Sequence, residues 1–163
     1  MNSRFQDKFH IMADKIKYAT FVLSGILFGI PATKIQEVLE LQTIVPVPLS
    51  RRTFPGMINL RGQILPVVDL RDHLQLADAE SDSEVERQMA VVRFPDGLLT
   101  FLIDRVGAIV DVDTSLYEEP SETLKSSIRE VVNHMCKLDR QILLVLDIDR
   151  LARTLTPQLS ASV

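Results

Sequence analysis

The chain has 163 residues, a length that suits one domain or one domain built of two small halves. Its formal net charge is −4 and no long run of Lys or Arg occurs, which argues against nonspecific nucleic-acid binding, because contact with phosphates needs a concentrated basic face. The single cysteine, Cys136, excludes an intramolecular disulfide. We expect it to be a buried apolar group rather than a reactive thiol, since no cationic cluster surrounds it.

Residues 1–16 are predicted to form an N-terminal tail. Four apolar residues recur there at helical spacing, so a short docked helix and a loose terminus are both open: Phe5, Phe9, Met12 and Ile16. Charges throughout this segment exclude a signal peptide. The longest uncharged window, residues 18–33, is too short to span a bilayer. We therefore expect a cytoplasmic protein that does not insert directly into the membrane.

The next part of the chain predicts two hairpins with a connection between them. "TFVLSGILFGI" indicates strand, turn at Ser24-Gly25, and strand, and Pro31 should end the second strand. "ATKIQEVLEL" (32–41) is expected to supply one or two helical turns, and a Pro-punctuated connection follows. "GMINLRGQILPVVDL" (56–70) then predicts a hairpin whose turn is Arg61-Gly62.

Residues 75–88 are acidic, lack aromatic residues and are predicted to be a solvated linker. Strands and turns then recur in a similar order. We expect strands over 89–94, 98–104 and 107–113, a polar loop over 117–127, and a hairpin over 131–147.

Two hairpins repeat each other. "LRGQILPVVD" (60–69) and "LDRQILLVLD" (138–147) share six residues at an offset of 78. Each ends in an aspartate, Asp69 or Asp147, before a helical segment, so both are predicted to be helix N-caps. The chain thus divides into two related halves of roughly five short strands, and units of this size usually close into small barrels. The sequence predicts a mainly β fold of two packed barrels with a groove between them.

The sequence has few features of a catalytic site. The three histidines, His10, His73 and His134, lack metal-ligand spacing, and neither a phosphate-binding loop nor a nucleophile elbow occurs. One alternative is a small barrel enzyme with Asp69 and Asp147 as an acid–base pair. Another is a barrel that binds single-stranded nucleic acid, although the chain has no Trp and two Tyr. We expect no catalysis, no metal and no cofactor.

Arg61 stands at a hairpin turn, where a solvated charge is one interpretation. The other is an arginine held at a groove rim, where its planar guanidinium can bind a carboxylate or backbone carbonyls. Glu37 is the natural intramolecular partner, through an ion pair that orders the surface around it.

The segment "FPGMINLRGQILPVVDLRDHL" resembles the signature of CheW-like domains, a family of chemotaxis coupling proteins. The matching positions are Gly56, Asn59, Leu60, Arg61, Gly62, Pro66, Asp69, Leu70 and Arg71. "FGIPATKIQEVLEL", "FLIDRVGAIVDV" and "ILLVLDIDRLA" match further family segments. The resemblance covers residues 17–155, which leaves 156–163 as a C-terminal tail.

This resemblance implies two intertwined SH3-like five-stranded barrels with short connecting and C-terminal helices. It implies a non-catalytic adaptor, without a cofactor, that couples the cytoplasmic tips of methyl-accepting chemoreceptors to the regulatory domain of the histidine kinase CheA at membrane-associated receptor arrays. By position, the receptor-binding residues would be Ile35, Glu37, Val38 and Arg61. Candidates for contact with the kinase are Met89, Val91, Glu118, Glu119 and Glu122.

Overall fold

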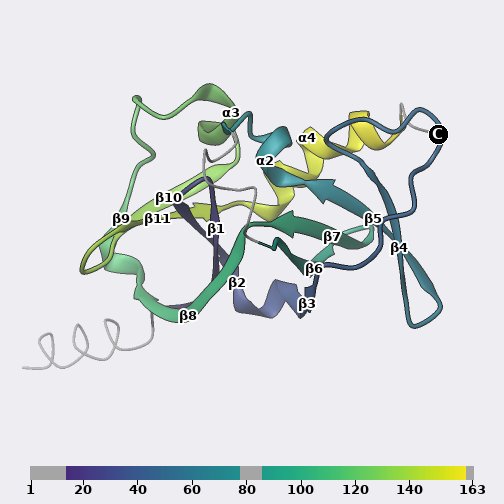
Figure 1. The fold of residues 1–163 in the computed structure, drawn as a ribbon. Coiled ribbons are helices and arrows are strands. Elements are labelled where there is room, and N and C mark those ends of the chain that lie inside the picture. Colours follow the sequence, from purple (N-terminus) through teal and green to yellow (C-terminus); the bar gives the residue numbers. More distant parts are fainter. Residues whose placement is uncertain (1–13, 78–85, 161–163) are drawn as a thin grey trace, which may run out of the picture.

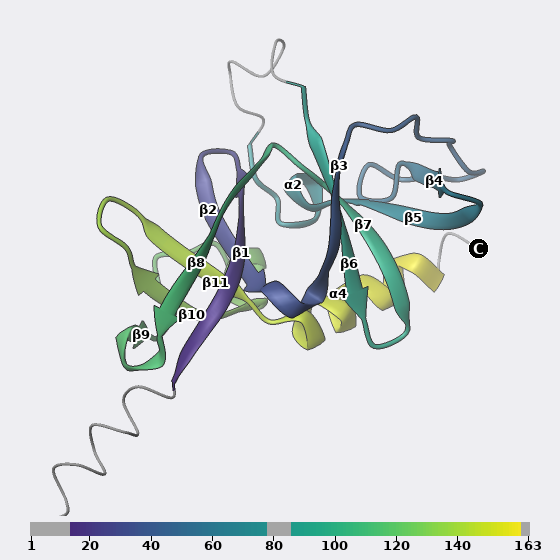
Figure 2. The same cartoon turned by 90° about the horizontal axis from the view of Figure 1, so that it is seen from below.

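Two β-sheets lie side by side in the computed structural model, which describes residues 14–77 and 86–160 (Figures 1 and 2). One sheet has six strands in the order β8-β1-β2-β11-β10-β9, and the other has five in the order β3-β6-β7-β5-β4. The first half of the chain supplies β1 (Lys15–Leu23), β2 (Ile26–Pro31), β3 (Ile35–Glu40), β4 (Gly56–Leu60) and β5 (Gln63–Asp69). The second supplies β6 (Gln88–Phe94), β7 (Gly97–Ile103), β8 (Arg105–Asp113), β9 (Tyr117–Glu118), β10 (Val132–Lys137) and β11 (Ile142–Leu146).

The helical elements are short except for the last one. They are α2 (Leu70–His73), α3 (Ser126–Arg129), α4 (Ile148–Ser160) and the 3-10 turns η1 (Ala32–Lys34) and η2 (Thr114–Leu116). Helix α4 follows β11 and runs along the five-stranded sheet (Figure 1). No helix among the described residues is both long and apolar enough to cross a membrane.

Local chemistry explains the two tight hairpins of the first half. Ser24 and Gly25 have φ angles of 48° and 77°, and Arg61 and Gly62 have φ angles of 51° and 87°. Left-handed backbone at both central positions matches the twist of the flanking strands. The side chain of Asn59 stabilises the second turn by accepting a hydrogen bond from the Gly62 amide at 2.8 Å. Both predicted hairpins are therefore confirmed, as is the hairpin β10–β11.

The two halves exchange strands. β5 lies parallel to β7 and β11 lies parallel to β2, so each sheet contains strands from both halves of the chain. The order β8-β1-β2-β11-β10 in one sheet corresponds to β3-β6-β7-β5-β4 in the other. This arrangement confirms the predicted duplication and fits the intertwined barrels implied by the resemblance.

Of the one or two helical turns expected within residues 32–41, the structure has one. Only Ala32–Lys34 form a 3-10 turn, and Ile35–Glu40 form strand β3, antiparallel to β6. A bulge shifts the register between Ile35 and Glu37. The extra residue places Ile35 and Val38 on the same side of the strand, so the apolar spacing imitates that of a helix.

Three apolar clusters fill the molecule. One lies within the six-stranded sheet and includes Tyr18 and Cys136, and a second lies within the five-stranded sheet and includes Met89 and Val91. The third and largest includes Phe28, Phe101, Leu151 and Leu155, and it joins both sheets to α4. Strand β6 serves two clusters, because alternate side chains point to opposite faces of a strand. A shared core of this kind makes the two sheets one packing unit.

Both duplicated aspartates are helix caps, as predicted. Asp69 Oδ1 accepts a hydrogen bond from the Arg71 amide at 3.1 Å, and Asp147 Oδ1 accepts one from the Arg150 amide at 3.0 Å. Helix α4 continues to Ser160, so the segment that we assigned to a C-terminal tail begins as helix.

The structure also differs from the prediction at the end of the N-terminal tail and within the polar loop. Ile16 lies in β1, whereas Phe5, Phe9 and Met12 are outside the described residues, as is most of the expected linker. Strand β9 and the start of α3 fall inside the expected polar loop 117–127.

Candidate functional site

An ion pair holds together the two edges of the five-stranded sheet. Arg61 at the tip of the β4–β5 hairpin donates from Nη1 to Glu37 Oε1 at 2.8 Å and from Nη2 to Glu37 Oε2 at 2.6 Å. Glu37 lies in the edge strand β3, and β4 is the opposite edge of the same sheet. The pair therefore links these two edges. The predicted contact between Glu37 and Arg61 is confirmed.

The pair is charged and partly open to solvent. The Arg61 side chain is 70% exposed and the Glu37 side chain is 23% exposed. Hydrogen bonds from Arg61 lower the pKa of Glu37 below its usual range, so the carboxylate stays ionised in mildly acidic solution. The exposed guanidinium is a fixed positive group beside strand β3.

A groove of about 400 Å³ opens between the two sheets next to this ion pair. Val38 and Ile109 are exposed by 44% and 66%, and both lie in the lining of this groove. The lining is almost entirely apolar and comprises Ala19, Thr20, Phe21, Ala32, Ile35, Val38, Ala90, Ile103, Val106, Gly107 and Ile109. Strands β1 and β8 form one wall, and β3 and β6 form the other. A groove of this chemistry suits the apolar stripe of a partner helix.

The four residues predicted to bind a receptor occupy this region in two pairs. Ile35 and Val38 line the groove. Glu37 and Arg61 form the ion pair beside it and are absent from the lining. Strand β3 connects the two pairs, since it carries three of the four residues.

The opposite wall of the groove was missed by reasoning from the sequence. Val106 and Ile109 lie in β8, in a stretch of alternating acidic and apolar residues. A signal was available: "KIQEVLE" (34–40) and "RVGAIVD" (105–111) have similar residues at five of seven positions. Recognition of this second repeat would have placed Val106 and Ile109 opposite Ile35 and Val38.

Two of the candidate kinase contacts conflict with the structure. Met89 and Val91 are fully buried in the cluster within the five-stranded sheet, so their side chains are inaccessible to a partner. Glu118 and the loop residues Glu119 and Glu122 are exposed. Lys137 Nζ lies 3.6 Å from Glu118 Oε1. Contact of these three acids with a kinase stays a prediction.

The aspartates of the alternative enzyme hypothesis already have structural partners. Arg87 donates from Nη1 and Nη2 to Asp69 at 3.0 and 3.1 Å, in addition to the cap of α2. Asp147 caps α4 and lies 3.6 Å from Arg150 Nε. Each carboxylate is thus held by cationic and backbone donors. In residues 14–77 and 86–160, no group of three or more potential metal ligands comes together.

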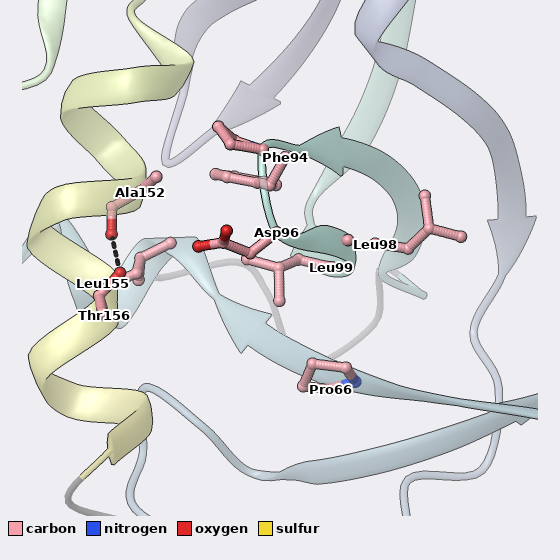
Figure 3. A pocket seen from close by; sticks show the side chains of 10 residues that line it. Pro66, Phe94, Asp96, Leu98, Leu99, Ala152, Leu155 and Thr156 are labelled. Carbon is pink, nitrogen blue, oxygen red and sulfur yellow. Dashed lines mark hydrogen bonds between the residues drawn. The ribbon is translucent and has the colours of Figure 1, made fainter.

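A second cavity, of about 290 Å³, lies between α4 and the β6–β7 turn (Figure 3). Asp96 is the one acidic residue in its lining, and Pro66, Phe94, Leu99 and Leu155 make most of it apolar. The hydroxyl of Thr156 donates to the Ala152 carbonyl within α4 at 2.7 Å. None of the predicted site residues lies there.

Cys136 is 1% exposed in β10, as expected for an apolar core residue. Burial raises the pKa of its thiol, and the nearby Glu118 carboxylate raises it further. We expect the native protein to react with a thiol-specific disulfide reagent at pH 8 at least about a hundredfold more slowly than the urea-unfolded chain, because the thiolate is the attacking species. Stopped-flow absorbance checks this; a fast phase in the native protein would contradict it.

Comparisons with known proteins agree with this architecture. The CheW-like domain family matches residues 17–156. A chemotaxis protein CheW from Treponema pallidum is 27% identical over 140 residues, covering 85% of this chain and 82% of the relative. Another, from Thermotoga maritima, is 28% identical over 148 residues, covering 89% and 95%.

The fold is also similar to that of a solved structure. The scaffolding protein TtCheW from Thermoanaerobacter tengcongensis matches with a TM-score of 0.70 and 22% identity, over 81% of this chain and 88% of that one. The family match includes strands of both sheets and every residue that lines the groove. This chain belongs to the CheW-like domain family.

Proposed function

We propose that this protein is a non-catalytic adaptor of a chemotaxis-type signalling system. It would act in the cytoplasm, at membrane-associated receptor arrays, by coupling the tips of methyl-accepting chemoreceptors to the regulatory domain of the histidine kinase CheA. Membership of the CheW-like domain family and the names of the relatives support this class of function.

The main observation that supports receptor binding is the apolar groove beside the Glu37–Arg61 ion pair. Ile35 and Val38 present apolar surface that a receptor helix would cover, and Arg61 adds a charged rim. An apolar centre with a polar edge is the usual composition of a transient protein interface. Glu37 serves by holding the guanidinium in place and neutralising it in the unbound state.

For the kinase half, we propose Glu118, Glu119 and Glu122 as contacts, and we exclude Met89 and Val91 because they are buried. The three acids lie close together in the chain, on the segment from β9 to α3. Acidic side chains on an exposed loop favour a partner with a basic surface and increase the rate of encounter with it.

The charge-reversing substitution Arg61→Glu tests the receptor site. We expect it to weaken binding to a purified chemoreceptor tip fragment by about tenfold, the size of effect expected from one charge-assisted hydrogen bond. Like charges would then face each other at Glu37 and residue 61. Binding is measured by isothermal titration calorimetry, with circular dichroism and melting temperature expected to stay near those of the wild type.

The matched control is Arg140→Glu, which makes the same charge change at the tip of the equivalent hairpin β10–β11. It should leave receptor binding unchanged. Equal losses of affinity in the two variants would show a general effect of net charge and contradict the proposed site.

A further inference from the structure

The walls of the groove repeat each other. Four pairs of lining residues are separated by the same 71 positions in the chain: Ala19 and Ala90, Ala32 and Ile103, Ile35 and Val106, and Val38 and Ile109. These pairs account for eight of the eleven lining residues. In three of these pairs, one residue lies in the six-stranded sheet and the other in the five-stranded sheet. In the fourth pair, Ala32 lies in η1 and Ile103 lies in β7.

Strand pairing supports this equivalence independently. Val38 pairs with Ala90, and its counterpart Ile109 pairs with Ala19. The register shifts at the same place in both ladders, between Ile35 and Glu37 in β3 and opposite Ala19 to Phe21 in the β1–β8 pair. The groove is therefore related to itself by an approximate two-fold rotation that exchanges β3 with β8.

The two-fold axis passes through the open side of the groove, because the rotation must leave the groove in the same place. The rotation reverses the N-to-C direction of a helix that lies in the groove. The apolar stripe of such a helix would therefore contact equivalent side chains whichever way the helix runs. The pair most unequal in size, Ala32 and Ile103, has Ile103 fully buried and away from the surface. Val38 and Ile109, the most exposed pair, differ by one methylene group.

Charge breaks this symmetry. The counterpart of Glu37 in β8 is Ala108, and the hairpin counterpart of Arg61 is Asp139. The bidentate ion pair consequently occurs beside β3, whereas the ion pair beside β8, between Lys17 and Asp111, is a single contact at another position of the repeat. Two of the five N–H groups of the Arg61 guanidinium bind Glu37, and the side chain is 70% exposed. A carboxylate on a partner helix would find this donor on one side of the axis.

We propose that the Glu37–Arg61 pair sets the direction in which a single partner helix lies in the groove, whereas the apolar lining accepts both directions. This inference rests on the proposed function, which places a chemoreceptor helix there. Glu37 and Arg61 then determine the orientation of the helix in addition to their contribution to its affinity.

The test uses the full chain, with labelled methyl groups, and a synthetic helical peptide from a chemoreceptor tip that carries a nitroxide at one end. Paramagnetic broadening of the Val38 and Ile109 methyl signals reports which end lies near which wall. In the wild type we expect a population bias of at least about tenfold, corresponding to one charge-assisted hydrogen bond. Moving the nitroxide to the other end of the peptide should reverse the pattern.

The double variant Glu37→Gln with Arg61→Gln should reduce the bias to within about twofold, with the peptide still bound by the apolar lining. Asp139→Asn is the matched control and should keep the wild-type bias. A bias that persists in the double variant would overturn the inference and leave the proposed receptor site standing. Failure of saturating peptide to broaden either methyl signal in the wild type would overturn both.

Discussion

Replacing Asp104 by alanine is expected to lower the free energy of unfolding by about 3–5 kcal/mol, the range for removing one partner of a buried ion pair. Asp104 lies between β7 and β8, where the chain crosses from the five-stranded to the six-stranded sheet. Its Oδ1 accepts from Arg71 Nη2, and its Oδ2 accepts from the Ser24 amide at 2.7 Å. The side chains of Arg71 and Asp104 are only 8% and 12% exposed.

The large effect follows from burial. Arg87 Nε also lies 3.6 Å from Asp104, so two guanidinium groups share this carboxylate. Without it, the buried charge of Arg71 would lose a neutralising partner, and the turn between β1 and β2 would lose the hydrogen bond that its Ser24 amide donates. Arg71 belongs to the sequence signature that identified the family, and its contact with Asp104 gives that position a structural role.

Urea unfolding followed by circular dichroism measures the loss. The control is Asp111→Ala, because Asp111 pairs with Lys17 at 2.9 Å while both side chains are more than half exposed. Exposed pairs of this kind contribute about 1 kcal/mol or less. Asp104→Asn keeps an acceptor for the Ser24 amide and should fall between the two. Equal losses in the Asp104→Ala and Asp111→Ala variants would refute the role given to burial.

The second large effect is expected for Gly56→Ala, with a loss of about 3 kcal/mol, the upper part of the range for overpacking. A Cβ atom at Gly56 would lie 2.2 Å from the Val45 carbonyl oxygen and 2.9 Å from Pro46 Cα. These are backbone atoms and cannot rotate away. Val45 and Met57 also exchange two backbone hydrogen bonds, of 2.8 and 2.9 Å, which the clash would break.

Gly25→Asn is the control for this substitution. Gly56 and Gly25 both have a positive φ, of 156° and 77°, but a Cβ at Gly25 would have no heavy atom within 4 Å, and Asn tolerates left-handed backbone. We expect a loss of about 1 kcal/mol or less for this change. Thermal unfolding compares the two variants, and similar melting temperatures would show that the contact with Val45 is unimportant. Because Gly56 begins β4, a shift there should also displace the hairpin tip that carries Arg61.

The ion pair of the candidate site was predictable because one strand and one turn supply its two residues. The ion pair was expected from a turn arginine and the carboxylate of Glu37, and the structure has it. The assignment of Ile35, Val38, Glu37 and Arg61 to receptor binding came from the family resemblance. Met89 and Val91 were misjudged for a physical reason. Strand β6 is buried on both faces, so its apolar run contains no indication of which side chains could reach a partner.

The sequence by itself determined the features that depend on near neighbours. The turns at Ser24-Gly25 and Arg61-Gly62, the capping aspartates and the repeat of the two hairpins all follow from residues a few positions apart. Only the tertiary structure decided that Ile35–Glu40 is a strand, that the halves exchange the hairpins β1–β2 and β6–β7, and that two walls 71 residues apart enclose one groove. These outcomes depend on hydrogen bonds to strands far along the chain. Such bonds can override local helical spacing, because an edge strand gains its partners only when the distant half has folded beside it.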